Sequence, residues 1–165
     1  MAELRNGLAR ALAGGAAGAT TVTLVHETVR RLRPDAPRMD VLGMRGLAGT
    51  LRKMGRKPPP RDQLHAATLV ADLLSNGLYF SLIGAGRGER AWMRGAILGL
   101  GAGIGGVLLP PLMGLGSRPS RRTPQTKAMT VAWYLLGGLA AAAAYRALAK
   151  PADSDAVDQD AGAGF

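Results

Sequence analysis

Residues 95–117 read GAILGLGAGIGGVLLPPLMGLGS and contain no charged side chain. A helix needs about 20 mostly apolar residues to cross a hydrocarbon core about 30 Å thick. This stretch is long enough, and Trp92 and Arg94 stand just before it, as residues of a membrane interface do. We therefore predict a membrane-spanning helix over residues 92–110.

The end of this stretch, residues 109–115, reads LPPLMGL. Pro110 and Pro111 should end or bend the helix near Leu109, because proline lacks the amide N–H that continues a helix. The glycine-rich span that runs into this segment is similar to the YagU-like family of inner-membrane proteins. The resemblance implies a small multi-span inner-membrane protein, and it brings no catalytic residues with it.

Three further stretches are long and apolar enough to span. Residues 128–148 begin with a long uncharged run, and residues 64–86 are interrupted by one charged residue, Asp72. Residues 7–29 are the least apolar of the set, because threonines dilute them. The long side chain of Arg10 can reach the interface from within this segment, so we include it in the span.

These stretches predict an all-α protein, a four-helix transmembrane bundle in a single membrane domain over residues 1–150. Three spans with an interfacial first helix are the alternative. A cleaved signal peptide would use Arg5 and Arg10 as its basic region, but no small-x-small cleavage site follows, so we expect a retained first helix. Residues 151–165 carry four aspartates among small residues, which predicts a disordered acidic tail.

Charge and apolar residues occupy different parts of the chain. The formal net charge is +10, although 47% of the 165 residues are hydrophobic. Residues 30–61 contain ten Lys or Arg residues and residues 117–127 contain four, against seven on the opposite side of a four-span bundle. The positive-inside rule then places both basic connections in the cytoplasm and both termini outside. The richness in Ala, Gly and Arg suggests a bacterial source, and hence the bacterial inner membrane.

Residues 40–54 predict an amphipathic helix within the first basic connection. Asp40 is the expected N-cap, Met39 and Met44 a hydrophobic staple across it, and Gly55 the C-terminal stop. Its apolar stripe consists of Met44, Leu47, Leu51 and Met54. Such a helix is expected to lie in the headgroup plane on the cytoplasmic side. An ordinary helix packed against the end of the bundle is the alternative.

The expected partners of the basic connection, residues 30–61, are the lipid bilayer and its anionic headgroups. Each nearby Lys or Arg contributes about 1 kcal/mol of attraction to an anionic membrane surface. Nucleic-acid readers usually interleave aromatic side chains among basic ones for stacking. No aromatic residue precedes Tyr79, so we expect no nucleic-acid partner.

Glycines recur at four-residue spacing in two of the predicted spans. They are Gly95, Gly99 and Gly103 in the third span, and Gly14 and Gly18 in the first. Small residues let membrane helices approach closely. These glycines are therefore predicted to form helix-packing faces, which either close the bundle or make a homo-oligomer.

A polar stripe follows one side of the second span, through His65, Asp72, Asn76 and Tyr79. Asp72 falls near the membrane centre, where an ionisable group costs roughly 3 kcal/mol and should face protein or water. The groups of other spans that could meet this stripe are His26, Glu27, Arg94 and Tyr134. The stripe is either a hydrogen-bonded network that fixes helix packing or a site for a proton, an ion or a small polar solute.

The sequence gives no support for catalysis or metal binding. There is no G-x-S-x-G, no H-E-x-x-H and no P-loop. The G-x-G-x-x-G string at Gly101, Gly103 and Gly106 lies inside an apolar span and follows no strand, so it is not a nucleotide loop. His26 and Glu27 would need two further ligands to hold a metal. We expect no enzyme activity, no metal and no cofactor.

The sequence therefore favours a small membrane protein with a structural or partner-binding role. The alternative is a small channel or transporter subunit for protons, ions or a small polar solute that uses the stripe around Asp72. A membrane enzyme is a third interpretation, which requires His26, Glu27 and Asp72 to meet in one cavity. A continuous polar path would favour transport, and a dry interior would favour the structural role.

Overall fold

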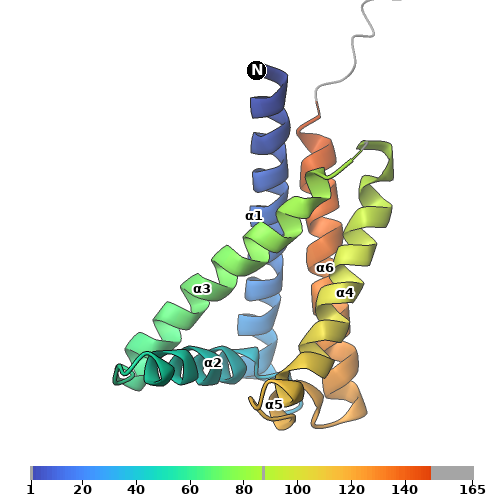
Figure 1. Cartoon of the computed structure of the whole chain (residues 1–165). Helices are drawn as coiled ribbons and strands as arrows, with labels where there is room; N and C mark the ends of the chain where they lie inside the picture. Colours follow the sequence, from blue (N-terminus) through green and yellow to red (C-terminus); the bar gives the residue numbers. More distant parts are fainter. Residues whose placement is uncertain (1, 87, 150–165) are drawn as a thin grey trace, which may run out of the picture.

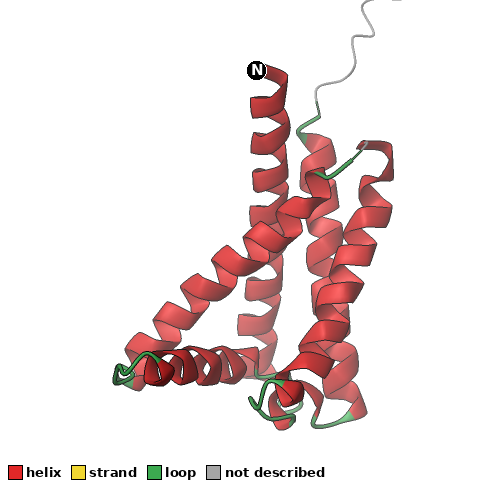
Figure 2. Cartoon of the chain, viewed as in Figure 1, coloured by secondary structure: helices red, strands yellow, loops and turns green. Residues whose placement is uncertain are grey.

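The computed structural model describes residues 2–86 and 88–149 of the chain. These residues form helices and connecting loops, with no strand among them (Figure 2). In chain order the helices are α1 (Ala2–Leu32), α2 (Met39–Lys53), α3 (Arg61–Ser81), η1 (Leu82–Gly84), η2 (Gly88–Arg90), α4 (Ala91–Leu112), α5 (Arg118–Arg121) and α6 (Pro124–Ala147). The predicted acidic tail, residues 151–165, lies outside the described residues.

Four helical segments are long and apolar enough to cross a membrane. They are Arg5–Leu32, Arg61–Gly84, Gly88–Leu112 and Pro124–Ala147. Each has 24 to 28 residues, which exceeds the roughly 20 that a hydrocarbon core requires. The predicted all-α fold with four spanning helices is confirmed, and the chain is a multi-pass membrane protein.

The long helices do not form a symmetrical bundle (Figure 1). Helices α1 and α4 each pack along α6, whereas α3 packs on α1 and diverges from α4 toward the far end of α2. Helix α2 lies across the end of the bundle, beside the short α5, and the N-terminus and the end of α6 lie at the opposite end. The core includes Phe80, Ile83 and Ala141, whose side chains are fully buried where α3 and η1 meet α1 and α6.

Glycines occupy the closest approaches of α6 to its neighbours. A Cβ atom added to Gly103 of α4 would lie 2.7 Å from the Cα atom of Val131. On the α1 side, a Cβ atom added to Gly18 would lie 2.7 Å from the backbone oxygen of Gly137. Gly14, Gly95 and Gly99 likewise face the α6 backbone. Larger residues at these positions would hold the helices apart, because the obstructing atoms are backbone and cannot rotate away.

Helix α4 continues past both of its prolines to Leu112, so they do not end it near Leu109; the alternative, a bend there, stays a prediction. Pro110 and Pro111 fall in its last turn, where their missing N–H groups cost only two hydrogen bonds. The helix instead ends through Gly114, whose φ of +74° suits glycine, and the Leu115 N–H donates to the Pro110 carbonyl over 2.9 Å.

Helix α2 begins earlier than the sequence predicts. Its N-cap position is Arg38, which provides no side-chain cap, so the expected N-cap role of Asp40 and the staple through Met39 are wrong. Asp40 instead lies buried in the first turn, where its carboxylate bonds to the Arg38 guanidinium. The predicted stop at Gly55 is confirmed: its φ is +72°, and its N–H donates to the Arg52 carbonyl.

Candidate functional site

Helix α2 is fixed across the bundle end by contacts at its N-terminus and its middle. The Arg38 backbone N–H donates to the Pro119 carbonyl over 2.8 Å, which joins the start of α2 to α5. Farther along, the Arg45 Nη1 donates to the Leu115 carbonyl over 2.7 Å, in the loop that follows α4. Helix α2 therefore has a defined position across the end of the bundle.

A buried charge cluster lies beneath the start of α2. Asp40 is 2% exposed, and its carboxylate accepts hydrogen bonds from the Arg38 Nε at 3.0 Å and Nη2 at 2.8 Å. Burial alone would raise the pKa of Asp40, but the Arg38 guanidinium outweighs it and holds that pKa below its ordinary value. The same hydrogen bonds raise the pKa of Arg38. His26 of α1 lies against this pair, with its Nε2 3.9 Å from Asp40 Oδ1.

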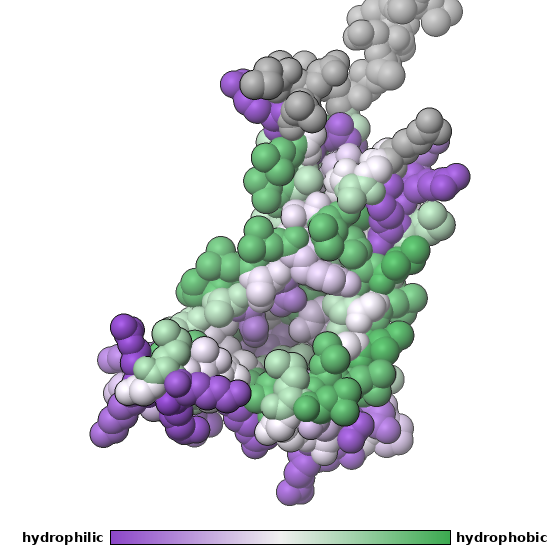
Figure 3. Space-filling model, in the orientation of Figure 1, coloured by the Kyte–Doolittle hydropathy of each residue, from purple (hydrophilic) through white to green (hydrophobic). Residues whose placement is uncertain are grey.

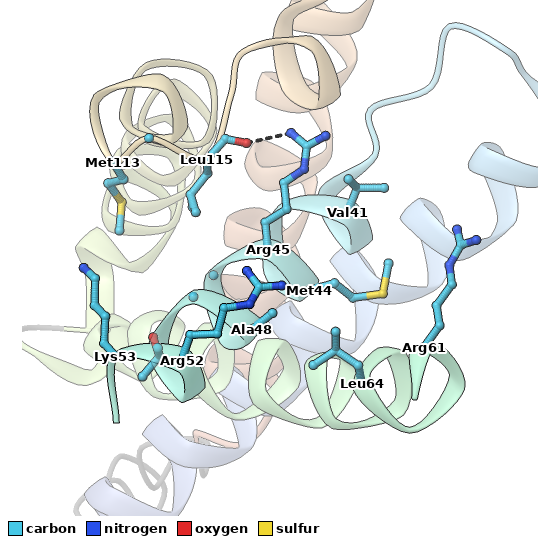
Figure 4. Close-up of a pocket in the computed structure, with 14 residues that line it drawn as sticks. Val41, Met44, Arg45, Ala48, Arg52, Lys53, Arg61, Leu64, Met113 and Leu115 are labelled. Carbon is cyan, nitrogen blue, oxygen red and sulfur yellow. Dashed lines mark hydrogen bonds between the residues drawn. The ribbon is translucent and has the colours of Figure 1, made fainter. Parts of the chain in front are cut away.

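A groove of about 750 Å³ runs beside α2, between the start of α3 and the loop after α4 (Figure 4). Its basic side chains are Arg45, Arg52, Lys53 and Arg61. Its larger apolar side chains are Val41, Met44, Leu64, Met113 and Leu115. Among the described residues, none of the four basic side chains has an acidic partner in an ion pair. The groove therefore combines uncompensated positive charge with an apolar lining.

A second, much smaller cavity lies inside the bundle at the level of Asp72. Its volume is about 20 Å³, and its polar lining comprises Thr23 and His26 of α1, Asp72 and Asn76 of α3, and Thr130 and Tyr134 of α6. Val22, Met39, Leu69 and Trp133 complete the wall. The structure thus brings together His26, Asp72, Asn76 and Tyr134 of the predicted polar site.

The other predicted members of that site lie elsewhere. The Tyr79 hydroxyl donates to the Leu98 carbonyl over 2.9 Å, which joins α3 to α4. Glu27 accepts from the Arg30 Nε at 2.7 Å, on the same helix. Arg94 donates to the Ile83 carbonyl at 3.0 Å, at the turn that connects α3 and α4. His65 does not line the cavity. The predicted polar stripe is therefore divided among several separate contacts.

Both sites contain residues that the sequence analysis missed. Met113 and Leu115 close one side of the groove, yet they follow a predicted span about 60 residues away in the chain. Met39 and Trp133 help enclose the cavity, and nothing in the local pattern of either residue indicates this. The ten Lys or Arg residues of the connection 30–61 were the one sequence signal that pointed to the groove.

The fold and these sites define a class: an α-helical multi-pass membrane protein with a basic groove at one end. Comparison of the chain with family models, with curated proteins and with solved structures finds no match.

Proposed function

We propose that this chain is a bacterial inner-membrane protein with a partner-binding role, and that its α2 groove binds the headgroups of anionic phospholipids. The observation that carries the proposal is the composition of the groove, which pairs four uncompensated basic side chains with an apolar lining. An anionic phospholipid matches both parts of the groove, since its phosphate is negatively charged and its acyl chains are apolar.

The position of the groove supports a lipid over a soluble anion. Helix α2 lies across the ends of the candidate spanning helices, where membrane headgroups would be. In Figure 4, Arg52 and Lys53 extend from α2, and Met113 and Leu115 lie across the groove from them. A phosphate near the basic side chains would leave an acyl chain to follow the apolar residues toward the bilayer.

The expected strength of the interaction follows from the number of basic residues. Each Lys or Arg near an anionic surface contributes about 1 kcal/mol, so the four in the groove together contribute about 4 kcal/mol. Removing three of them should weaken anionic-lipid binding by about 3 kcal/mol, or roughly a hundredfold. Arg45 should contribute less to lipid binding than the other three basic residues, because one of its donors already binds the Leu115 carbonyl.

The charge distribution supports a cytoplasmic position for the groove. The two most basic connections, residues 30–61 and 117–127, lie at the same end of the helices as α2 and α5. The positive-inside rule assigns that end to the cytoplasm and both termini to the other side. The cytoplasmic leaflet is also where anionic lipids attract basic segments.

The test measures thermal unfolding of the purified chain in neutral detergent micelles. We expect dioleoylphosphatidylglycerol to raise the unfolding temperature, because a ligand that binds the folded state stabilises it. Dioleoylphosphatidylcholine and inorganic phosphate at the same ionic strength serve as two further arms. The first lacks net charge and the second lacks an acyl chain, so neither should reproduce the shift.

Two triple variants of equal charge separate the groove from general electrostatics. Arg45→Gln/Arg52→Gln/Lys53→Gln removes groove cations, and Arg31→Gln/Arg33→Gln/Arg118→Gln removes exposed cations at the same end of the protein. Only the groove variant should lose the phosphatidylglycerol shift. Equal loss in both variants would mean that net charge attracts the lipid, and the groove would then have no specific role.

The alternative role in conduction has less support. A channel or transporter needs a polar path across the membrane, whereas the cavity beside Asp72 has a volume of only about 20 Å³. A space of that size accommodates about one water molecule. The partner-binding role therefore remains the better supported of the two proposals.

A further inference from the structure

The cavity beside Asp72 places a carboxylate at the middle of a spanning helix. Asp72 lies halfway along the Arg61–Gly84 segment and is half-buried. The hollow between α3 and α4 in Figure 3 shows hydrophilic surface at its base and hydrophobic surface on both sides. An ionised group at this depth is costly unless another charge or a set of hydrogen bonds compensates it.

The protein itself supplies no such compensation. Among the residues that the structure describes, no donor or cation bonds to the Asp72 carboxylate, and the Thr23 hydroxyl in the same cavity is also without a hydrogen bond. The His26 Nε2 donates to the Pro37 carbonyl at 3.1 Å, so this ring nitrogen does not bond to Asp72. Asp40, the nearest charged group of α2, is acidic and repels an ionised Asp72.

We infer that this cavity is a binding site for a single dehydrated alkali cation such as Na⁺, with the Asp72 carboxylate as its charged ligand. The volume of about 20 Å³ suits one water-sized occupant. A dehydrated alkali cation would both occupy the space and cancel the charge, whereas a proton on Asp72 would cancel the charge and leave the space to a water molecule.

The remaining lining fits a hard, singly charged cation. Asn76, Tyr134 and Thr23 line the cavity and carry neutral oxygen atoms, and oxygen is the ligand that hard cations prefer. A divalent ion is disfavoured because Asp72 is the one carboxylate in the lining. In agreement, the described part of the chain holds no group of three His, Cys, Asp or Glu side chains able to bind a metal ion.

The experiment compares thermal unfolding of the full chain in neutral detergent with NaCl or choline chloride at one ionic strength and pH. NaCl should raise the unfolding temperature in a saturable manner, and choline chloride should not.

Three variants link the effect to the cavity. Asp72→Asn should abolish the NaCl shift, and the near-isosteric Thr23→Val should raise the half-saturating NaCl concentration by about tenfold or more. Asp62→Asn is the matched control, since Asp62 is exposed at the start of the same helix, and it should keep the shift. If Asp72→Asn does not fold, Thr23→Val decides the outcome.

Two results would overturn the inference. One is a wild-type protein equally stable in NaCl and choline chloride. The other is stabilisation by acid alone, lost in Asp72→Asn and insensitive to Na⁺, which would make Asp72 a proton site. The titratable groups that face Asp72 are His26 of α1, Asp40 of α2 and Tyr134 of α6, so the acid arm is also run on His26→Gln and Asp40→Asn.

Discussion

Replacement of Gly99 by alanine is expected to force α4 away from α6. A Cβ atom at this position would lie 2.6 Å from the Tyr134 carbonyl oxygen and 2.6 Å from the Leu135 Cα atom. Carbon atoms in favourable contact are about 3.5–4.0 Å apart, so the two helices must separate locally by about 1 Å. No side-chain rotation relieves the clash, because both obstructing atoms belong to the α6 backbone.

The size of the effect follows from what this separation removes. Overpacking a well-packed interior costs about 1–3 kcal/mol. Close packing is also the main attraction between membrane helices, since lipid provides no hydrophobic drive for their association. The neighbouring contact between Gly95 and Gly138 would open together with that at Gly99, because the same two helices meet there. We therefore expect a loss of about 2 kcal/mol in the free energy of unfolding.

The assay is unfolding of the purified chain in mixed micelles by titration with sodium dodecyl sulfate, followed by far-ultraviolet circular dichroism. Gly105→Ala is the matched control on the same helix, since its Cβ atom would meet only the Leu109 side chain at 3.4 Å. Gly105→Ala should unfold at nearly the wild-type midpoint and Gly99→Ala at a clearly lower one. If both variants unfold at the same midpoint, the α4–α6 contact does not limit stability and the reasoning is refuted.

Two further predictions concern α2 and the end of α4. Acid should destabilise the fold through Asp40. The pKa of Asp40 in the folded chain is below its ordinary value, so its carboxylate stabilises the folded state at pH values above that ordinary pKa. This contribution is lost as the pH falls through the folded pKa. The thermal unfolding temperature should therefore fall below about pH 4 in the wild type and change less in Asp40→Asn. Parallel pH profiles of the two proteins would exclude this role of Asp40. Gly114→Ala, at a φ of +74°, should cost about 1 kcal/mol, which calorimetry can compare with Gly49→Ala, where a Cβ atom meets nothing.

The four spans could be predicted from sequence because their cause is local. A charge-free run such as residues 95–117 is long enough to cross hydrocarbon whatever its neighbours are. The end of α2 at Gly55 was predictable for the same reason, since a left-handed backbone position after an amphipathic stripe favours glycine. These features depend on residues within a few turns of one another.

The sites depended on contacts between residues far apart in the chain. Asp40 is a good N-cap by type, but Arg38 and the nearby His26 place it in a buried charge cluster instead. Arg94 and Tyr79 belong to the predicted polar set, yet each has a backbone carbonyl as its partner, Ile83 for Arg94 and Leu98 for Tyr79.

The sequence by itself determined which segments enter the membrane, which connection is basic and where polar side chains interrupt the apolar helices. Only the tertiary structure decided that Asp72 shares a cavity with residues of α1 and α6, and that the loop after α4 closes the groove beside α2. The physical reason is that hydrophobicity and backbone preference act along the chain. A cavity or a groove exists only where separate helices pack at a particular angle.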